Sequence, residues 1–356
     1  MLNRFFTALA AATLFSVSGL QAQVSTPKYS NEFMSIGVGG RALAMGNAQV
    51  AISRDATAGY WNPAGLLNIK TRYNAALMHS ELFAGIAKHD YGSFTTSLDT
   101  MSHLGISLIR LGVDDIPNTL NLFNENGQID YSRITYFSVA DWGALVSYAR
   151  KSRLIKGLQL GGNAKVIYRS VGNFANAWGF GIDAGAQLHR GNWHFGLMAR
   201  DITTTFNAWS YNSEELVFLD SVNTVPDNNV ELTLPKLIPG VAYQVNLTEK
   251  FSALATVDVD LTFDGQRNTL LSSDAISADP HGGIELSYNQ MIFVRGGLNN
   301  IQTFKNVEGG TSRKAQPNFG VGLAVRGLVL DMALAKMADN SSLNSIIVSL
   351  GYSFNK

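Results

Sequence analysis

The stretch "LNSIIVSLGYSF", which runs from Leu343 to Phe354, alternates between two kinds of side chain. Large apolar side chains fall on one face, and they belong to Ile346, Val348, Leu350, Tyr352 and Phe354. The other face carries Ile347, Ser349, Gly351 and Ser353. Because successive side chains of a β-strand point to opposite faces, the apolar set predicts contact with lipid and the other set predicts a lumen. This stretch therefore predicts a strand of a transmembrane β-barrel.

The same alternation recurs upstream and predicts about 14 strands, an even number as bacterial single-chain barrels require. The candidate strands lie at 73–79, 86–95, 101–111, 136–150, 156–169, 177–189, 192–201, 236–247, 250–260, 281–289, 291–299, 316–326, 328–338 and 343–354. The predicted fold class is therefore all-β, a transmembrane antiparallel β-barrel. We expect it to occupy residues 73–356.

The connections between these strands alternate in length. Short connections lie at 97–101, 189–192, 247–249, 289–290 and 326–328, and long ones at about 112–135, 202–235, 261–280 and 300–315. Outer-membrane barrels have short periplasmic turns and longer outer loops. The alternation thus predicts an outer-membrane barrel, in contact with outer-membrane lipid, whose two termini lie in the periplasm.

Composition narrows the class of protein further. Charged residues make up 15% of the chain, below the roughly 25% of soluble domains, and glycine occurs 34 times. No run of about 18 apolar residues follows the first residues, so no transmembrane helix is predicted. The 27 basic and 27 acidic residues balance, which argues against a nucleic-acid partner.

The first residues predict export from the cytoplasm. Arg4 precedes the short apolar stretch Phe5 to Leu20, and small or modest side chains follow it. This order is typical of a secretory signal peptide. We expect the signal peptide to cover residues 1–22, with cleavage after Ala22 or, as a second choice, after Gln23. The alternative is an N-terminal anchor helix.

A segment before the first strand predicts a plug. A barrel of about 14 strands is wider than side chains alone can fill. Residues 23–72 are too many for a tail, and they include "GRALAMGNAQVAISRDATAGYWNPAGL", from Gly40 to Leu66. Its first half is helix-like with small residues, and Pro63 biases Asn62 away from helix, so a tight turn should follow. We therefore expect Gly37 to Leu67 to fold inward as a hatch.

This segment resembles the N-terminal signature of the PorV/PorQ group of outer-membrane proteins. The matching residues are Gly40, Arg41, Ala42, Met45, Gly46, Ala48, Asp55, Trp61, Asn62, Pro63, Ala64, Gly65 and Leu66. The PorV/PorQ group is related to the FadL-type fatty-acid transporters, whose hatch carries a similar Asn-Pro-Ala-Gly. FadL-type members have a hatch and fourteen strands. The resemblance covers about thirty residues and gives them a structural role in the hatch.

The resemblance implies a non-enzymatic part in type IX protein secretion. A PorV-like adaptor docks on the translocon barrel, binds secreted cargo through its C-terminal domain and passes it on for surface attachment. The implied partners are therefore other type IX secretion proteins. The alternative that FadL resemblance implies is transport of hydrophobic small molecules, with an apolar pocket between hatch and wall and a lateral gap near a kinked strand. An open porin fits less well, because the hatch would block the lumen.

One long connection carries features of a contact site. The predicted outer loop 202–235 contains four aromatic residues, Phe206, Trp209, Tyr211 and Phe218. Exposed apolar surface often marks a site of interaction. These residues predict a partner-contact loop, and the alternative is a loop folded back on its own barrel rim. Glycines at 161–162, 179, 181 and 185 could kink strands or allow close packing of the hatch.

No residue pattern predicts catalysis, a metal site or a cofactor. The six histidines form no helical pair with metal-ligand spacing, and the chain has no cysteine. Asp258 and Asp260 share one strand face, as polar lumen residues would. "GVGG" at 37–40 lacks the glycine spacing of a dinucleotide site. Lys165 shares a face with Asn163, so we expect it to point into the lumen without a specific ligand.

Overall fold

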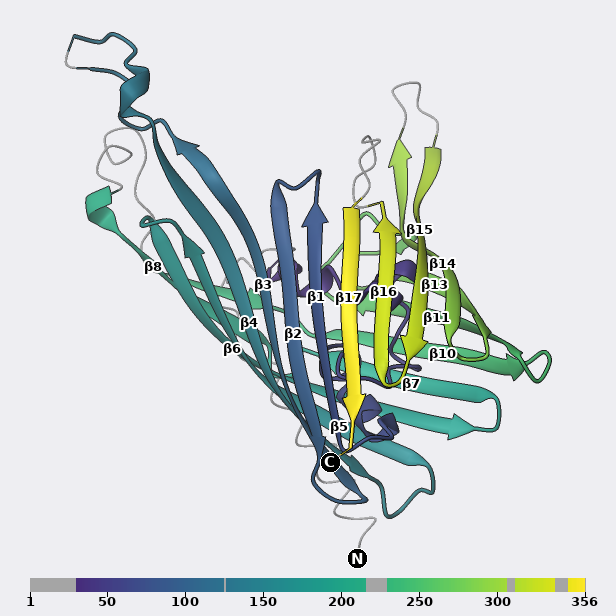
Figure 1. The fold of residues 1–356 in the computed structure, drawn as a ribbon. Helices are drawn as coiled ribbons and strands as arrows, with labels where there is room; N and C mark the ends of the chain where they lie inside the picture. Colours follow the sequence, from purple (N-terminus) through teal and green to yellow (C-terminus); the bar gives the residue numbers. More distant parts are fainter. Residues whose placement is uncertain (1–29, 125, 216–228, 306–310, 337–344, 356) are drawn as a thin grey trace, which may run out of the picture.

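The fold is that of a computed structural model, which describes residues 30–124, 126–215, 229–305, 311–336 and 345–355. The predicted signal peptide lies outside the described residues. The chain forms a closed antiparallel barrel of 14 strands, in which β1 pairs with β17 to complete the wall (Figure 1). The predicted fold class is thus confirmed.

The wall strands are long and follow one another around the barrel. They are β1 (Tyr73–Leu82), β2 (Ala87–Ser97), β3 (Ser102–Asn118), β4 (Thr135–Lys151), β5 (Leu158–Val171), β6 (Ala175–Arg190), β7 (Trp193–Arg200), β10 (Lys236–Asn246), β11 (Phe251–Thr262), β13 (Ser277–Tyr288), β14 (Ile292–Lys305), β15 (Thr311–Val325), β16 (Leu328–Ala335) and β17 (Ser345–Phe354). Three short strands are additional: β8 (Thr205–Tyr211), β9 (Val230–Thr233) and β12 (Leu271–Ser272).

Each predicted wall strand is present, but several run further than predicted. The predicted connection 112–135 shrinks to 119–134 because β3 and β4 stay paired as far as Asn118 and Thr135. In Figure 1 this hairpin projects beyond its neighbours at the end opposite the C-terminus. Backbone pairing needs no alternation of side chains, so a strand can continue where the two-faced pattern has stopped. We call the end that holds Phe354 the short-turn end and the opposite one the long-loop end.

The two faces of the wall separate as the alternation predicts. On β17, Ile346, Val348, Leu350 and Tyr352 are exposed on the outer face, whereas Ser345 and Ile347 are buried on the inner face. The same pattern gives β6 and β16 a regular succession of buried and exposed residues. No helix in the described ranges is long and apolar enough to cross a membrane.

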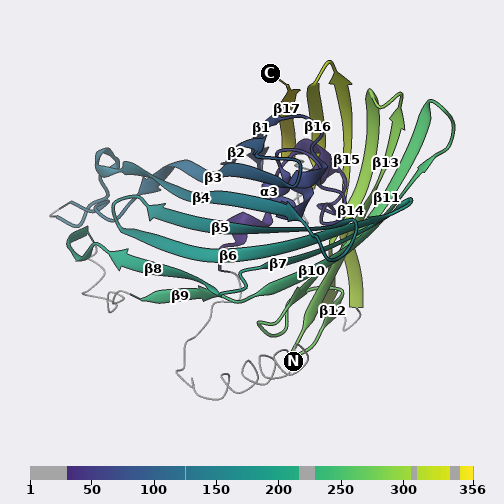
Figure 2. The same cartoon turned by 90° about the horizontal axis from the view of Figure 1, so that it is seen from below.

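The hatch lies inside the barrel (Figure 2) and contains short helices joined by turns. They are the 3-10 helices η1 (Glu32–Ser35) and η2 (Pro63–Asn68) and the α-helices α2 (Gly40–Ala44) and α3 (Ala58–Trp61). Asn62 has an extended backbone, and its side chain caps η2 by accepting a hydrogen bond from the amide of Ala64. The prediction that Asn62 lies outside a helix is therefore confirmed, and the tight turn expected after it is a 3-10 helix of six residues.

Glycines of the wall receive the hatch. An added Cβ at Gly161 would lie 2.5 Å from the amide nitrogen of Ala64, and one at Gly283 would lie 2.6 Å from the carbonyl of Met45. Further wall glycines that abut the hatch in this way are Gly143, Gly185, Gly196, Gly240, Gly297 and Gly320. Of the two roles considered for Gly161 and Gly185, the structure favours close packing of the hatch over a kink.

Polar bonds fix the hatch to the wall at buried positions. The carboxylate of Asp258 accepts hydrogen bonds from the amides of Gln49 and Val50, at 2.7 and 2.8 Å. The Asn62 amide nitrogen donates to the carbonyls of Val50 and Ala186, at 2.9 and 3.0 Å. These bonds satisfy backbone groups that water cannot reach.

Replacing Asn62 by alanine should lower the free energy of unfolding by about 1–3 kcal/mol, because buried carbonyls would lose their donor. Urea unfolding in lipid vesicles, followed by tryptophan fluorescence, measures the change. Asn192→Ala in an exposed turn is the matched control and should have little effect. Equal stability of the two variants would contradict the role of Asn62 as the anchor of the hatch.

Candidate functional site

The wall is interrupted where β7 passes into β8. Ala199 on β7 pairs with Ala184, and Phe206 on β8 pairs with Phe180. An advance of seven residues from β7 to β8 therefore corresponds to an advance of only four residues along β6. The three surplus residues lie between Asp201 and Thr205, and both Asp201 and Thr204 have positive φ angles, of 56° and 59°. The insertion therefore makes a sharp bend in the chain between β7, which pairs with β10, and β8, which does not.

The bend leaves one hairpin without a neighbour on one side. The short strand β9 pairs with β8, whereas β10 pairs with β7 and β11. Among the described residues, no pairing joins β9 to β11 or β12. In Figure 2 the ends of β9 and β12 lie apart. The barrel is thus closed at the level of β10, and its wall is broken beyond that level toward the long-loop end.

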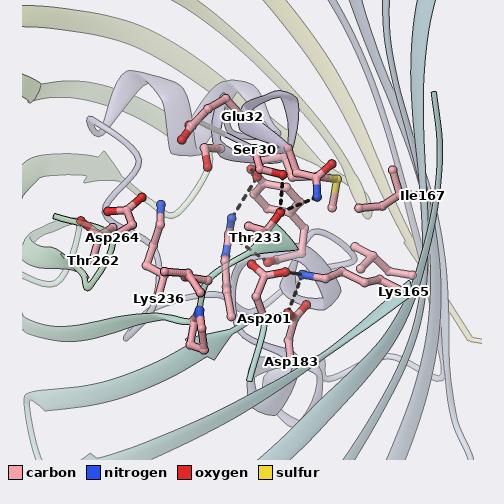
Figure 3. Close-up of a pocket in the computed structure, with 18 of the residues that line it drawn as sticks. Ser30, Glu32, Lys165, Ile167, Asp183, Asp201, Thr233, Lys236, Thr262 and Asp264 are labelled. Carbon is pink, nitrogen blue, oxygen red and sulfur yellow. Dashed lines mark hydrogen bonds and ion pairs between the residues drawn. The ribbon is translucent and has the colours of Figure 1, made fainter. Parts of the chain in front are cut away.

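A cavity of about 50 Å³ lies at this break, and Figure 3 shows its lining. Residues on both sides of the break contribute, with Thr233 from β9 and Thr262 from the end of β11. Eight charged side chains contribute to the lining, namely Glu32, Lys165, Asp183, Arg200, Asp201, Lys236, Asp264 and Arg267. The cavity is therefore a polar chamber, and the apolar pocket expected between hatch and wall does not occur here.

Lys165 lies at the centre of this charge network. Its ammonium is 2.8 Å from Asp183 and 2.5 Å from Asp201, and its side chain is 4% exposed. The prediction that Lys165 points into the lumen is therefore confirmed. The sequence did not indicate its partners, because Asp183 lies on β6 and Asp201 at the bend. The ion pairs tie the bend to the wall on its inner side.

Arg200 is buried beside the network and has a different environment. It donates hydrogen bonds to the carbonyls of Met34 and Tyr60, at 3.0 and 3.2 Å. Its guanidinium also lies 4.6 Å from the ring centre of Tyr60. No carboxylate in the described ranges lies within ion-pair distance of Arg200. This cation is thus held by the hatch.

The first described residues of the hatch line the inner side of the break. The Ser30 and Thr233 hydroxyls lie 2.6 Å apart, and the Asn31 amide donates to the Thr233 hydroxyl at 2.7 Å. Asn207 on β8 donates to the Asn31 side chain at 3.0 Å. Arg267 connects the other side of the break to the hatch through Glu32, at 3.0 Å. The hatch therefore contacts both edges of the broken wall.

The break communicates with a larger space above the hatch. A cavity of about 500 Å³ lies toward the long-loop end, and Arg200, Lys236 and Thr262 line both this cavity and the chamber. A separate cavity of about 540 Å³ lies on the other side of the hatch, lined by Arg41, Arg54 and Lys70. No residue lines both large cavities. The hatch thus divides the lumen.

The predicted hatch residues occupy three kinds of position. Gly40, Met45 and Gly46 lie against β13–β16, whereas Trp61, Asn62, Pro63, Ala64 and Gly65 lie on the β5–β7 side. Arg41 pairs with Glu285 on β13 at 2.8 Å. Asp55 stays within the hatch and accepts hydrogen bonds from the amide and hydroxyl of Thr57.

The predicted partner-contact loop is largely a strand. Phe206, Trp209 and Tyr211 lie on β8, which pairs with β6, so the expectation that these residues belong to a loop is wrong, whereas their role in partner contact stays a prediction. Phe206 is exposed beside Phe180, whereas the Trp209 indole donates to Glu231 at 2.7 Å. Aromatic residues favour strands, which explains the outcome. Phe218 lies outside the described residues.

Comparison with solved structures relates this fold to a known one. The Ralstonia pickettii toluene transporter TbuX aligns with a TM-score of 0.52 and 13% identity over 89% of this chain and 98% of its own. The CymD monoaromatic hydrocarbon channel gives 0.57 and 13% over 90% and 98%. A FadL homologue of Pseudomonas aeruginosa gives 0.51 and 11% over 89% and 98%.

The chain has the fold of the FadL-type outer-membrane transporters. At these levels of identity the similarity concerns the fold alone. No protein-family model and no curated protein matches the sequence.

Proposed function

We propose that the chain is a FadL-type outer-membrane transporter for hydrophobic small molecules that carry a polar group. The observation that carries this proposal is the wall break between β9 and β11, which adjoins a cavity above a seated hatch. The break would give a molecule a route between such a cavity and the lipid, past Ser30, Asn31 and Glu32 of the hatch. We place the short-turn end in the periplasm, because outer-membrane barrels have their short turns there.

The charged side chains that line the chamber support the proposal that the transported molecule carries a polar group. Lys165, Arg200 and Lys236 surround a space that a pure hydrocarbon would leave with poorly solvated charges. A hydroxyl would instead meet both donors and acceptors there, since four cationic and four anionic side chains line the chamber. The apolar part of such a molecule would remain on the lipid side of the break, where the outer faces of the strands are apolar.

A variant that fills the chamber tests the transport route. Thr262 is buried at the break, and its hydroxyl has no hydrogen-bond partner among the described residues. Thr262→Phe should therefore fold and should lower uptake at least several-fold, since a packed ring leaves no free path. Uptake of labelled p-cresol and toluene would be measured in host cells that lack their own FadL-type transporter.

The neighbouring residue provides the matched control. Leu261 precedes Thr262 on β11, so its side chain points to the opposite face. Leu261→Phe adds a ring on the lipid side and should leave uptake unchanged. Uptake by Thr262→Phe equal to that of the wild type, at equal amounts of folded barrel, would refute passage through the chamber.

A second candidate function is a PorV-like adaptor in type IX secretion. What supports it is the resemblance of the residues from Gly40 to Leu66 to the PorV/PorQ hatch signature. A fixed plug suits a barrel that docks partners and passes no cargo through its lumen. Affinity purification from a detergent extract should recover the translocon barrel or cargo with the C-terminal signal domain. Recovery of neither, with secretion unchanged in a deletion strain, would exclude this function.

A further inference from the structure

The cavity below the hatch is a second candidate site, distinct from the wall break. We call it the short-turn vestibule; it has a volume of about 540 Å³ and is bounded by hatch residues on one side. Lys70 and Gln290 lie at exposed positions in the connector before β1 and in the β13–β14 turn, respectively. The vestibule therefore opens toward the short-turn end, and the hatch closes its inner side.

Three arginines converge on one glutamate in this vestibule. Arg41 and Arg295 each donate through Nε to Oε2 of Glu285, at 2.8 and 2.7 Å. Arg295 also contacts Asp331 at 2.7 Å. The other oxygen, Oε1, accepts a hydrogen bond from Nη2 of Arg41 at 3.4 Å and lies 3.7 Å from Arg54. Glu285 thus already has two close guanidinium partners before Arg54 reaches it.

Arg54 is the cation that this cluster leaves least satisfied. Its only ion contact is the distant one to Glu285, and it donates no hydrogen bond within the described part of the chain. Its side chain is 47% exposed, although those of Arg41 and Arg295 are 11% and 2% exposed. The free edge of the Arg54 guanidinium therefore faces the vestibule.

The charge balance of the lining is positive. The cationic side chains that line the vestibule are Arg41, Arg54, Lys70 and Arg295, and the anionic ones are Asp55, Glu285 and Asp331. Lys70 has no ion pair among the described residues. The pKa of Arg54 is lowered from its ordinary value, above all by the positive charge of Arg41, although Glu285 and Asp55 act in the opposite direction.

We propose that the short-turn vestibule binds an oxyanion, a phosphate or carboxylate group, on the guanidinium of Arg54, with Lys70 at its mouth. A guanidinium matches such a group with two parallel N–H donors. A bound oxyanion would relieve the repulsion between Arg54 and Arg41. The inference goes beyond the proposed function, because either a transporter or an adaptor could hold this site. The oxyanion could be a free periplasmic anion or the head group of an amphiphile.

Binding of inorganic phosphate and of octyl phosphate to the full chain tests the proposal. The protein would be held in non-ionic detergent at low ionic strength, because salt screens partly exposed charges. Titration calorimetry should give saturable binding, and Arg54→Gln should weaken it about tenfold or more, as expected when a charged hydrogen-bond donor is lost. Arg54→Lys keeps the charge and should weaken binding less.

Two further variants complete the design. Arg153→Gln removes an exposed arginine from a turn at the same end, outside the vestibule, and should bind like the wild type. Lys70 lies in the exposed connector before β1, so Lys70→Gln should weaken binding less than Arg54→Gln does. Tighter binding of octyl phosphate than of phosphate would identify an amphiphile as the source, and equal binding would identify a free anion.

Phosphate affinity of Arg54→Gln within about twofold of that of Arg153→Gln would overturn the proposal, since a lost charged donor costs more. The same holds if neither phosphate nor octyl phosphate binds the wild type. Uptake through the wall break is measured separately with Thr262→Phe, so failure of one proposal leaves the other unaffected.

Discussion

Replacing Glu285 by alanine is expected to lower the free energy of unfolding by about 3–5 kcal/mol, the cost of removing one partner from a buried ion cluster. Glu285 is 4% exposed and holds Arg41 of the hatch together with Arg295 of the wall. Without the carboxylate, these guanidinium groups, which are 11% and 2% exposed, would lose the counter-charge between them. Denaturant unfolding in lipid vesicles measures the loss.

Two variants show whether charge or packing is responsible. Glu285→Gln keeps the size and one acceptor oxygen, so its stability should fall between those of the wild type and the alanine variant. Glu249→Ala removes an exposed carboxylate from the β10–β11 turn and should change the free energy by less than about 0.5 kcal/mol. If Glu285→Ala were as stable as Glu249→Ala, the cluster would not hold the hatch.

Replacing Gly297 by valine is expected to unseat the hatch. A Cβ at this position would lie under 3.0 Å from the backbone of Met45 and Gly46, and backbone atoms cannot move aside as a flexible side chain can. Overpacking of this kind costs about 1–3 kcal/mol. Because the clash lies at the hatch, the hatch should become accessible to added protease, and planar bilayers should show ion conductance.

The adjacent residue is the control for this change. Gly296 points to the other face of β14, and its nearest neighbours would lie 4.0 Å from an added Cβ. Gly296→Val should therefore keep a protected hatch and a non-conducting barrel. Protease resistance of Gly297→Val equal to that of Gly296→Val would show that the hatch tolerates displacement, and would contradict the role of the wall glycines.

The strands and the turn of the hatch were accessible from sequence because both depend on local rules. Alternation with a period of two is set by the geometry of a single strand, so the apolar series from Ile346 to Phe354 indicates its own outer face. Proline restricts its own φ angle and the residue before it, so Asn62 and Pro63 predict their own turn. Neither inference requires knowledge of a distant contact.

The wall break was not predictable in the same way. The residues from Asp201 to Thr205 look like the start of a loop, and only their register against β6 identifies them as an insertion within a strand. The aromatic residues of β8 were assigned to a loop for the same reason. Register is a property of two strands together, so one strand alone does not specify where its pairing slips.

The sequence by itself determined the two-faced strands, their number and the turn at the foot of the hatch, because each follows from bond geometry and side-chain alternation within a few residues. The tertiary structure alone decided which wall glycines receive the hatch, that Glu285 holds Arg41, and that Arg54 is left facing a cavity. These pairings join residues far apart in the sequence, by 244 positions for Arg41 and Glu285. Closure of the barrel brings them together, and no local rule encodes them.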